Sequence, residues 1–175
     1  MKVDDKEFKE YVSERELDAI IQRLAEDIKI DYQGKNPFFL LMLNGAFIFA
    51  ADLLRRFDDS VEMGFVRYTS YSGLSSTGEV KSDISIPKQV QGRDVIVIED
   101  IIDTGCTMQR FLPELRKSRP KSVAIVALLS KPEVLNGKVK IDYVGKEIKN
   151  EFVVGYGLDY NGAGRNLKSI YVLSE

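Results

Sequence analysis

The sequence predicts an α/β protein in which a central, mainly parallel β-sheet is flanked by helices on both faces. Short apolar runs rich in Val, Ile and Leu indicate strands that are buried on both sides. The segments between them carry apolar residues at helical spacing, and the two kinds of segment alternate along the chain. A length of 175 residues suits one such core, so we expect residues 1–175 to form a single domain.

The first half of the chain predicts a helix, a strand, a second helix and a second strand. Ser13 and Glu16 have the spacing of a capping box, and the helix that they open continues to about Ile30. Gly34 and Pro37 bound the turn that comes after it. The elements that follow are a buried strand at 38–43, a helix at 46–56 and an alternating strand at 61–67.

The second half begins with residues 69–91, whose Ser, Gly and Thr content predicts an exposed, mobile excursion. The β-branched residues at 95–98 predict a strand buried on both faces, followed by a helix at 108–117 and a strand at 122–129. Short strands are predicted near Tyr143, Phe152 and Tyr171. We expect this late cluster of strands to form a small subdomain.

The charge balance and the apolar pattern exclude several partners. The chain has 25 basic and 27 acidic residues, so we expect no nucleic-acid partner and no attraction to anionic membranes. The apolar stretch at 38–54 is interrupted by Asn44, Gly45 and Asp52, which argues against a membrane span. The acidic N-terminus lacks the apolar core of a signal peptide, so a cytoplasmic location is expected.

The chain contains no histidine, which restricts its chemistry more than any other feature of its composition. A His general base, a Ser-His or Cys-His nucleophile and a His metal site are therefore excluded. Its single cysteine, Cys106, excludes an intrachain disulfide and a cysteine-cluster zinc site. Acid–base work falls to Asp, Glu, Lys or Tyr, and any metal would be a hard, oxygen-bound ion such as Mg²⁺.

The most informative stretch is 99–107, with the sequence Glu-Asp-Ile-Ile-Asp-Thr-Gly-Cys-Thr. We expect Glu99 and Asp100 where the buried strand ends, and Asp103 at the start of a small-residue turn before a helix. Ligands of parallel sheets bind at the carboxyl ends of the strands, and helix N-termini bind anions. Acids in a first helical turn are also an ordinary structural feature. Three acids and two threonines around one glycine instead favour a phosphorylated sugar as the ligand.

This stretch resembles the phosphoribosyl-diphosphate (PRPP) binding motif of type I phosphoribosyltransferases. Its form Glu-Asp-Ile-Ile-Asp-Thr-Gly-x-Thr is similar to that of the hypoxanthine and hypoxanthine-guanine members. The resemblance implies their fold, with a small hood subdomain over the base and a flexible lid loop. It implies transfer of the phosphoribosyl group to N9 of a 6-oxopurine, giving IMP or GMP and pyrophosphate in purine salvage. It also implies Mg²⁺ as cofactor and a homodimer or homotetramer.

The resemblance assigns a role to each part of the motif. Glu99 and Asp100 would hold the ribose hydroxyls and the associated Mg²⁺. Asp103 would take a proton from purine N7 or hydrogen-bond to it. Cys106 stands where some relatives carry Lys, and we expect its backbone N–H to matter more than its oxidisable thiol. The residues that would bind the 5′-phosphate are Asp103, Thr104, Gly105, Cys106 and Thr107.

The resemblance also marks a pyrophosphate site. Leu43, Asn44 and Gly45 join a buried strand to a helix, and the competing interpretation is an ordinary strand–helix turn. In the family this loop binds pyrophosphate, often through a non-proline cis peptide, which we carry over to the Leu43–Asn44 bond. Some relatives have Lys in place of Asn44. Binding here would therefore rest more on backbone amides, on the metal and on Arg165, whose guanidinium would clamp pyrophosphate oxygens.

Ser70 and Tyr71 resemble the start of the family's flexible catalytic loop. Such a lid would shield a reactive cationic transition state from water. Composition alone favours an ordinary polar surface loop at this place.

Four further residues would form the purine site by resemblance. Lys131 would donate to the exocyclic oxygen of a 6-oxopurine, which selects against adenine. Phe152 would stack on the purine, and the backbone of Val153 would meet its edge. Asp159 would lie near the purine and near Mg²⁺ on the pyrophosphate, so the expected metal ligands are Glu99, Asp100 and Asp159. Without the resemblance, Lys131 is a solvated lysine, Phe152 is core and Asp159 is part of a polar loop.

Three other functions fit parts of the sequence. A PRPP-binding regulator would keep the fold without catalysis, but we see no basic face or added DNA-binding segment. An aspartic protease would use Asp103-Thr104-Gly105, but that fold is almost entirely β and needs two such loops. A transferase for another base is the third. Lys131 disfavours adenine, whereas hypoxanthine, guanine and xanthine all stay open.

Overall fold

The computed structural model of the chain describes residues 1–67 and 85–174, and it confirms the predicted α/β class. Five strands form the main sheet in the order β4-β3-β5-β6-β7, and all neighbouring strands are parallel. They are β3 (Phe38–Leu43), β4 (Glu62–Arg67), β5 (Asp94–Ile102), β6 (Ser122–Ser130) and β7 (Tyr143–Glu147). Because the strands are parallel, their carboxyl ends share one edge of the sheet.

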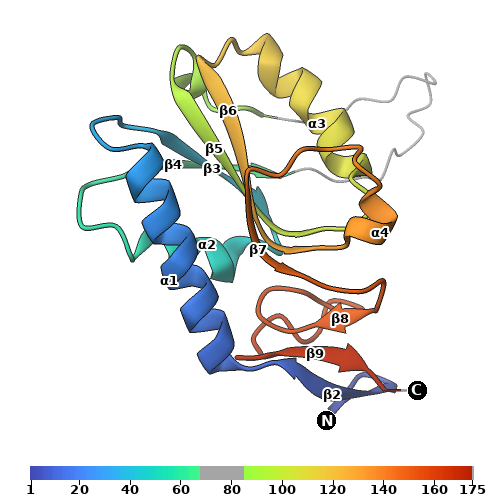
Figure 1. Cartoon of the computed structure of the whole chain (residues 1–175). Helices are drawn as coiled ribbons and strands as arrows, with labels where there is room; N and C mark the ends of the chain where they lie inside the picture. Colours follow the sequence, from blue (N-terminus) through green and yellow to red (C-terminus); the bar gives the residue numbers. More distant parts are fainter. Residues whose placement is uncertain (68–84, 175) are drawn as a thin grey trace, which may run out of the picture.

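A second, antiparallel sheet lies next to that edge (Figure 1). Its order is β1-β2-β9-β8. We call this sheet, together with residues 155–169, the hood. Both chain termini lie in it (Figure 1), and it corresponds to the predicted small subdomain. Its strands are β1 (Lys2–Val3), β2 (Lys6–Val12), β8 (Val153–Val154) and β9 (Ile170–Leu173).

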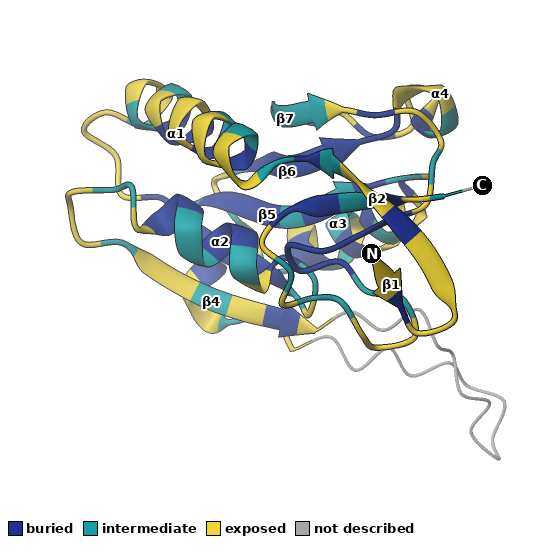
Figure 2. Cartoon of the chain, turned by 90° about the horizontal axis from the view of Figure 1, so that it is seen from below, coloured by how far each residue is buried: buried dark blue, intermediate teal, exposed yellow. Residues whose placement is uncertain are grey.

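Helices cover both faces of the main sheet (Figure 1). One face packs against α1 (Glu14–Asp31) and α2 (Phe47–Leu54), and the other against α3 (Cys106–Lys117). Successive residues of a strand point to opposite faces, so Phe39 belongs to the first core and Phe38 to the second. In Figure 2 most of β5 and β6 is dark blue, as expected of strands that are buried on both faces. The short helices are a 3₁₀ turn (Lys88–Val90) and α4 (Pro132–Leu135).

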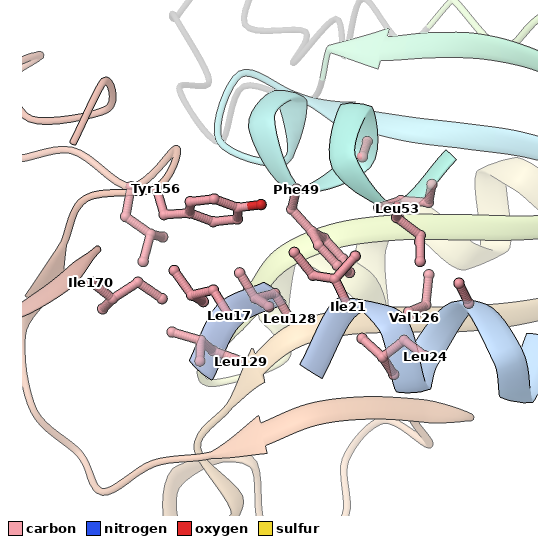
Figure 3. Close-up of a cluster of buried hydrophobic side chains, with 14 of the residues drawn as sticks. Leu17, Ile21, Leu24, Phe49, Leu53, Val126, Leu128, Leu129, Tyr156 and Ile170 are labelled. Carbon is pink, nitrogen blue, oxygen red and sulfur yellow. The ribbon is translucent and has the colours of Figure 1, made fainter. Parts of the chain in front are cut away.

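A continuous apolar core joins the hood to the main sheet. Leu17 of α1, Phe49 of α2 and Leu128 of β6 belong to the same buried cluster as Tyr156 and Ile170 of the hood (Figure 3). Each fully buried large apolar side chain stabilises the fold by about 1.5–3 kcal/mol. This burial holds the hood over the carboxyl edge of the sheet.

The predicted start of α1 is confirmed. Ser13 Oγ accepts a hydrogen bond from the Glu16 backbone N–H at 3.3 Å, as expected of an N-cap residue. The Glu16 carboxylate pairs with Lys146 of β7 at 2.7 Å instead of folding back on the cap. The helix ends at Asp31, one residue beyond the expected Ile30.

The strand predicted at 95–98 is longer than expected, and Glu99 and Asp100 lie inside it rather than after it. β5 continues to Ile102 because Ile101 and Ile102 keep the parallel register with Leu129 and Ser130 of β6. The helix expected from residue 108 already begins at Cys106. The helix predicted at 46–56 is the shorter α2, and the strand predicted at 61–67 begins at Glu62.

The late strands do not all belong to the hood, so that part of the prediction is wrong. The strand near Tyr143 is β7, which pairs with β6 at the edge of the main sheet. The hood is completed instead by β1 and β2, which we did not predict. A register shift between Glu10 and Val12 places Phe8 and Val12 in different cores, which disrupts the alternation that marks a strand.

The predicted lid residues Ser70 and Tyr71 lie outside the described residues, as does most of the excursion at 69–91. No helix in the described ranges 1–67 and 85–174 is both long and apolar enough to cross a membrane.

Candidate functional site

The predicted site residues of the main sheet come from three adjacent strands. Asn44 and Gly45 follow β3, Glu99 and Asp100 lie in the last part of β5, and Lys131 follows β6. The order β3-β5-β6 brings these strand ends together at the edge beneath the hood. This is where ligands bind in parallel sheets.

Gly45 lies directly against the carboxylate of Asp100. A Cβ atom at position 45 would be 1.7 Å from Asp100 Oδ2, so no side chain fits there while Asp100 keeps its position. The preceding Leu43–Asn44 peptide bond is cis, as expected from the resemblance. The loop between β3 and α2 therefore approaches β5 with its backbone rather than with a side chain.

Glu99 and Asp100 are acids in an unfavourable environment. Burial raises the pKa of Glu99 well above its ordinary value, and the neighbouring Asp100 adds to the rise. Glu99 is half-buried as a residue, but its Oε2 atom is inaccessible and has no hydrogen-bond partner within the described part of the chain. Burial also raises the pKa of Asp100 to about 6, although the Ile101 N–H donates to its Oδ1 at 2.8 Å.

Asp103 has a different environment from these two acids. Its Oδ2 accepts a hydrogen bond from Lys131 Nζ at 3.0 Å. Lys131 is only 6% exposed, whereas Asp103 is half-buried and open to solvent on one side. The pair joins the ends of β5 and β6. It also brings the expected purine O6 donor and the expected N7 acceptor together.

The Thr-Gly-Cys-Thr turn leads into α3 as the motif predicts. Gly105 precedes the helix with a left-handed φ of +76°, and Thr104 Oγ1 accepts from the Cys106 N–H at 3.4 Å. The N–H groups of a first helical turn have no intrahelical acceptor and are free for an anion. Glu99, Ile101 and residues 102–108 line a small hollow beside this turn. Cys106 is exposed.

Asp159 and Arg165 of the hood form an ion pair, with Arg165 Nη2 and Asp159 Oδ1 2.5 Å apart. Arg165 Nη1 donates to the Gly157 carbonyl at 2.7 Å. Arg165 lowers and Asp159 raises the pKa of Asp100, which places both of their charges near that carboxylate. The hood therefore brings a cation and a carboxylate to the end of β5.

The two apolar residues of the predicted purine site are in the hood. Phe152 immediately precedes β8, is 46% exposed, and has its ring centre 5.7 Å from Tyr160 and 6.3 Å from Phe8. The Val153 side chain is buried, so only its backbone is available to a ligand. Among the described residues, the ring contacts of Phe152 are to Phe8 and Tyr160, neither of which we predicted for the site.

The donor set suits a hard cation, although Glu99, Asp100 and Asp159 do not form a ready-made metal site. No group of three or more possible ligands that could hold an ion occurs in the described ranges. The inaccessible Glu99 Oε2 atom lacks a partner among the described residues, and all three residues offer oxygen. Mg²⁺ prefers oxygen ligands and is commonly held by one or two carboxylates with substrate phosphates and water. These residues therefore fit an ion that arrives with a phosphorylated ligand.

The glycine that joins the hood to this site, Gly157, was not predicted from the sequence. Gly157 has a φ of +102°, and a Cβ atom there would lie 2.1 Å from the Gly45 carbonyl oxygen. The pattern Gly155-Tyr156-Gly157 was the available signal, because paired glycines often mark a close backbone approach.

The chain is similar in sequence to a known protein family and to several of its members. Residues 8–161 match the family model described as the phosphoribosyl transferase domain. The chain is 44% identical over 163 residues to the hypoxanthine-guanine phosphoribosyltransferase of Lactococcus lactis subsp. lactis, covering 93% of this chain and 88% of that protein. It is 45% identical over 163 residues to the bifunctional protein TilS/HprT of Listeria monocytogenes serotype 4b, covering 93% of this chain but spanning only 25% of that relative.

The solved structures agree with the sequence relatives. The crystal structure of a hypoxanthine-guanine phosphoribosyltransferase (hpt-2) from Bacillus anthracis superimposes with a TM-score of 0.85 at 34% identity, covering 97% of this chain and 99% of that one. That structure carries a HEPES molecule in its active site.

Proposed function

The chain belongs to the phosphoribosyltransferase family, among its hypoxanthine-guanine members, and from this premise we propose that it transfers the 5-phosphoribosyl group of PRPP to a 6-oxopurine. The observation that carries the proposal is that two acid sites lie together at the end of β5, between the ends of β3 and β6. Asp100 faces Gly45 and lies near the hood residues Arg165 and Asp159. Glu99 lines the hollow beside the start of α3, and Asp103 faces Lys131. One site suits a sugar phosphate and the other suits a base with a carbonyl oxygen.

On the PRPP side, the buried acids would accept hydrogen bonds from the ribose hydroxyls. The Glu99 oxygen that has no partner in the described ranges and the raised pKa of Asp100 support this role, because donors or a cation would stabilise both carboxylates. The α3 N-terminus with Thr104 and Thr107 would hold the 5′-phosphate. The Leu43–Gly45 loop and Arg165 would hold the pyrophosphate.

We propose Mg²⁺ as the cofactor, held by Glu99, Asp100 and Asp159 together with PRPP. When bound, the ion would offset the negative charge of the pyrophosphate group. Arg165 would orient the pyrophosphate oxygens.

On the purine side, Lys131 would donate to the exocyclic oxygen and Asp103 would face N7. In the absence of a base these two side chains bind each other, so a 6-oxopurine would replace each partner with its own acceptor and donor. Purine N9 would form a bond to the anomeric carbon while the bond to pyrophosphate oxygen breaks, and the pyrophosphate leaves with the electron pair. Asp103 would take the N7 proton or stabilise it by a hydrogen bond.

The rest of the purine site would come from the hood. Phe152 would stack on the base, the Val153 backbone would meet its edge, and Ser70 and Tyr71 would belong to a lid. We further propose that residues 1–175 act as one domain, that the protein is cytoplasmic, and that it forms a homodimer or homotetramer.

The test is product formation by the purified protein. With PRPP, Mg²⁺ and hypoxanthine we expect equal amounts of IMP and pyrophosphate, and with any one of the three left out we expect neither. Binding of PRPP without any product would favour a regulator instead.

A further inference from the structure

Tyr156 anchors the hood to α2. It is 7% exposed, and its hydroxyl is directed toward that helix (Figure 3). There it donates a hydrogen bond to Asp52 Oδ2 at 2.5 Å. Burial and the Asp52 carboxylate raise the pKa of Tyr156, so the hydroxyl keeps its proton and stays a donor. This bond joins the hood to the helix that begins directly after the Leu43–Gly45 loop.

The residue next to Tyr156 touches both groups that we assign to pyrophosphate. Gly157 lies so close to the Gly45 carbonyl that a Cβ atom would be 2.1 Å from its oxygen. Its own carbonyl accepts from Arg165 Nη1 at 2.7 Å, and its N–H donates to the Arg165 carbonyl at 2.9 Å. A shift of Gly157 would therefore move the loop contact and the guanidinium together.

We propose that Tyr156 and Asp52 are a positioning pair for the pyrophosphate site, an inference that rests on the proposed function. Their hydrogen bond fixes the position of the hood turn at residues 155–157 against α2. That turn presents Gly157 to Gly45 and holds Arg165 beside the loop. The proposed purine contacts of Lys131 and Asp103 come from the ends of β6 and β5, and Phe152 and Val153 precede the turn. Because only Asp159 is shared with the turn, the pair should act mainly on PRPP and much less on the purine.

The surroundings of the pair make a clean variant possible. A cleft of about 340 Å³ opens beside the hydrogen bond, and the Asp52 side chain is 36% exposed. When the tyrosine hydroxyl is removed, water can solvate the carboxylate, so Tyr156→Phe should fold with its ring in place. The cleft is lined by Glu14, Asp18, Asp52, Arg56, Tyr156 and Lys168, among other residues.

The chain also provides a matched control. The Tyr143 hydroxyl donates to Asp31 Oδ2 at 2.7 Å and joins the start of β7 to the end of α1. Tyr143→Phe therefore removes the same kind of bond at the amino end of a strand, whereas the proposed site lies at the carboxyl ends.

The experiment measures pyrophosphate binding in the presence of Mg²⁺ by calorimetry, and KM for PRPP and hypoxanthine by steady-state kinetics. We expect the Kd of pyrophosphate and the KM of PRPP to rise about tenfold in Tyr156→Phe, because Gly157 and Arg165 lose the hydrogen bond that positions them. Both constants should change less than about twofold in Tyr143→Phe. The KM of hypoxanthine should stay within about twofold in both variants.

Variants of Asp52 separate positioning from general stability. Asp52→Asn keeps an acceptor oxygen and should bind pyrophosphate nearly as the wild type does, whereas Asp52→Ala should match Tyr156→Phe. The double variant Tyr156→Phe/Asp52→Ala should bind pyrophosphate no more weakly than either single variant, because both substitutions remove the same hydrogen bond. Equal losses in Tyr156→Phe and Tyr143→Phe would overturn the proposal, as would a parallel rise in the KM of hypoxanthine.

The binding measurement also separates this inference from the proposed function. A wild type that binds pyrophosphate but forms no nucleotide would refute the transferase activity while the comparison of variants still tests the pair. A wild type that binds no pyrophosphate would overturn the positioning role itself.

Discussion

Glu99 and Asp100 lie inside β5, where Asp100 and the Oε2 atom of Glu99 are buried, and neither acid has a direct cationic partner in the described part of the chain. Asp103, on the same segment, is open to solvent on one side and bound to Lys131. The fold raises the pKa of the first two acids and gives the third a lysine. The acids of one short motif thus have opposite electrostatic environments.

The difference suggests how the two substrates would enter. The carboxylates of Glu99 and Asp100 would gain electrostatic stabilisation when a ligand brings donors or a cation, so this site would suit PRPP with Mg²⁺. Asp103 and Lys131 already stabilise each other. A base would therefore bind favourably only if it gives each of them a new hydrogen-bond partner. A 6-oxopurine offers an acceptor to Lys131 and a donor to Asp103, whereas the amino group of adenine would leave the lysine unpaired.

The largest expected effect comes from Asp103→Asn. Loss of the acid that we propose to face N7 should lower kcat by about 10²- to 10⁴-fold. KM for PRPP should stay within about twofold, because the proposed ribose and pyrophosphate contacts, and most of those to the 5′-phosphate, come from other residues. Steady-state kinetics with hypoxanthine measure both constants, and an unchanged kcat would remove Asp103 from the reaction.

The second prediction concerns the stability cost of the buried acids. Asp100 has a folded pKa of about 6 against 3.8 for the ordinary group, so the folded protein binds more protons than the unfolded chain between these values. The free energy of unfolding therefore falls as the pH rises through this window. Asp100→Asn removes the charge and should stabilise the ligand-free protein by about 2–3 kcal/mol near pH 7, with little gain below about pH 4.

Urea unfolding of wild type and variant across this pH range measures the difference. Asp103→Asn is the matched control and should give no such gain, because Lys131 already stabilises that carboxylate. If both variants were stabilised equally near neutral pH, the contrast between the two acid sites would not hold.

A third variant removes the lysine from the purine side. Lys131→Gln should lower kcat/KM for hypoxanthine by about 10- to 100-fold, the value of a hydrogen bond from a charged donor, and leave adenine nearly unaffected. Lys121→Gln is the control, because Lys121 pairs with Asp94 at the opposite end of β5 at 3.2 Å. Similar losses for hypoxanthine and adenine would show that Lys131 does not read the exocyclic oxygen.

The smallest expected effect tests the close contact between Gly45 and Asp100. Gly45→Ala would force Asp100 from its position and should raise KM for PRPP about tenfold while KM for hypoxanthine changes little. The control is Gly92→Ala, because no atom of the described residues lies within 4 Å of a Cβ at that position, although Gly92, unlike Gly45, has a left-handed φ of +71°. Kinetics of both variants at saturating second substrate give the comparison.

The parts of the molecule that could be predicted depend on local signals. The Ser13 cap, the apolar strands of the main sheet and the turn before α3 each follow from residues close together in sequence. The motif at 99–107 could be assigned for the same reason. The cis bond at Leu43–Asn44 was expected from the family resemblance alone, and the structure confirms it.

The parts that could not be predicted depend on contacts between distant segments. Phe8 and Val12 are four residues apart, as on a helix, and only pairing with β9 turns that segment into a strand. The contacts of Gly157 with Gly45 and of Tyr156 with Asp52 join segments about a hundred residues apart. Glycine and tyrosine at these places indicate a turn and a core residue, but not the partner.

The measurement that tests the account most directly is pyrophosphate release by the wild-type protein with PRPP, Mg²⁺ and each of four bases. We predict release with hypoxanthine and guanine, and a kcat/KM for adenine lower by about 10³-fold or more, because adenine leaves the buried Lys131 without an acceptor. Xanthine tests the contacts at the purine C2 position. Release with adenine alone, or with no base at all, would contradict the division of the motif into a PRPP site and a 6-oxopurine site.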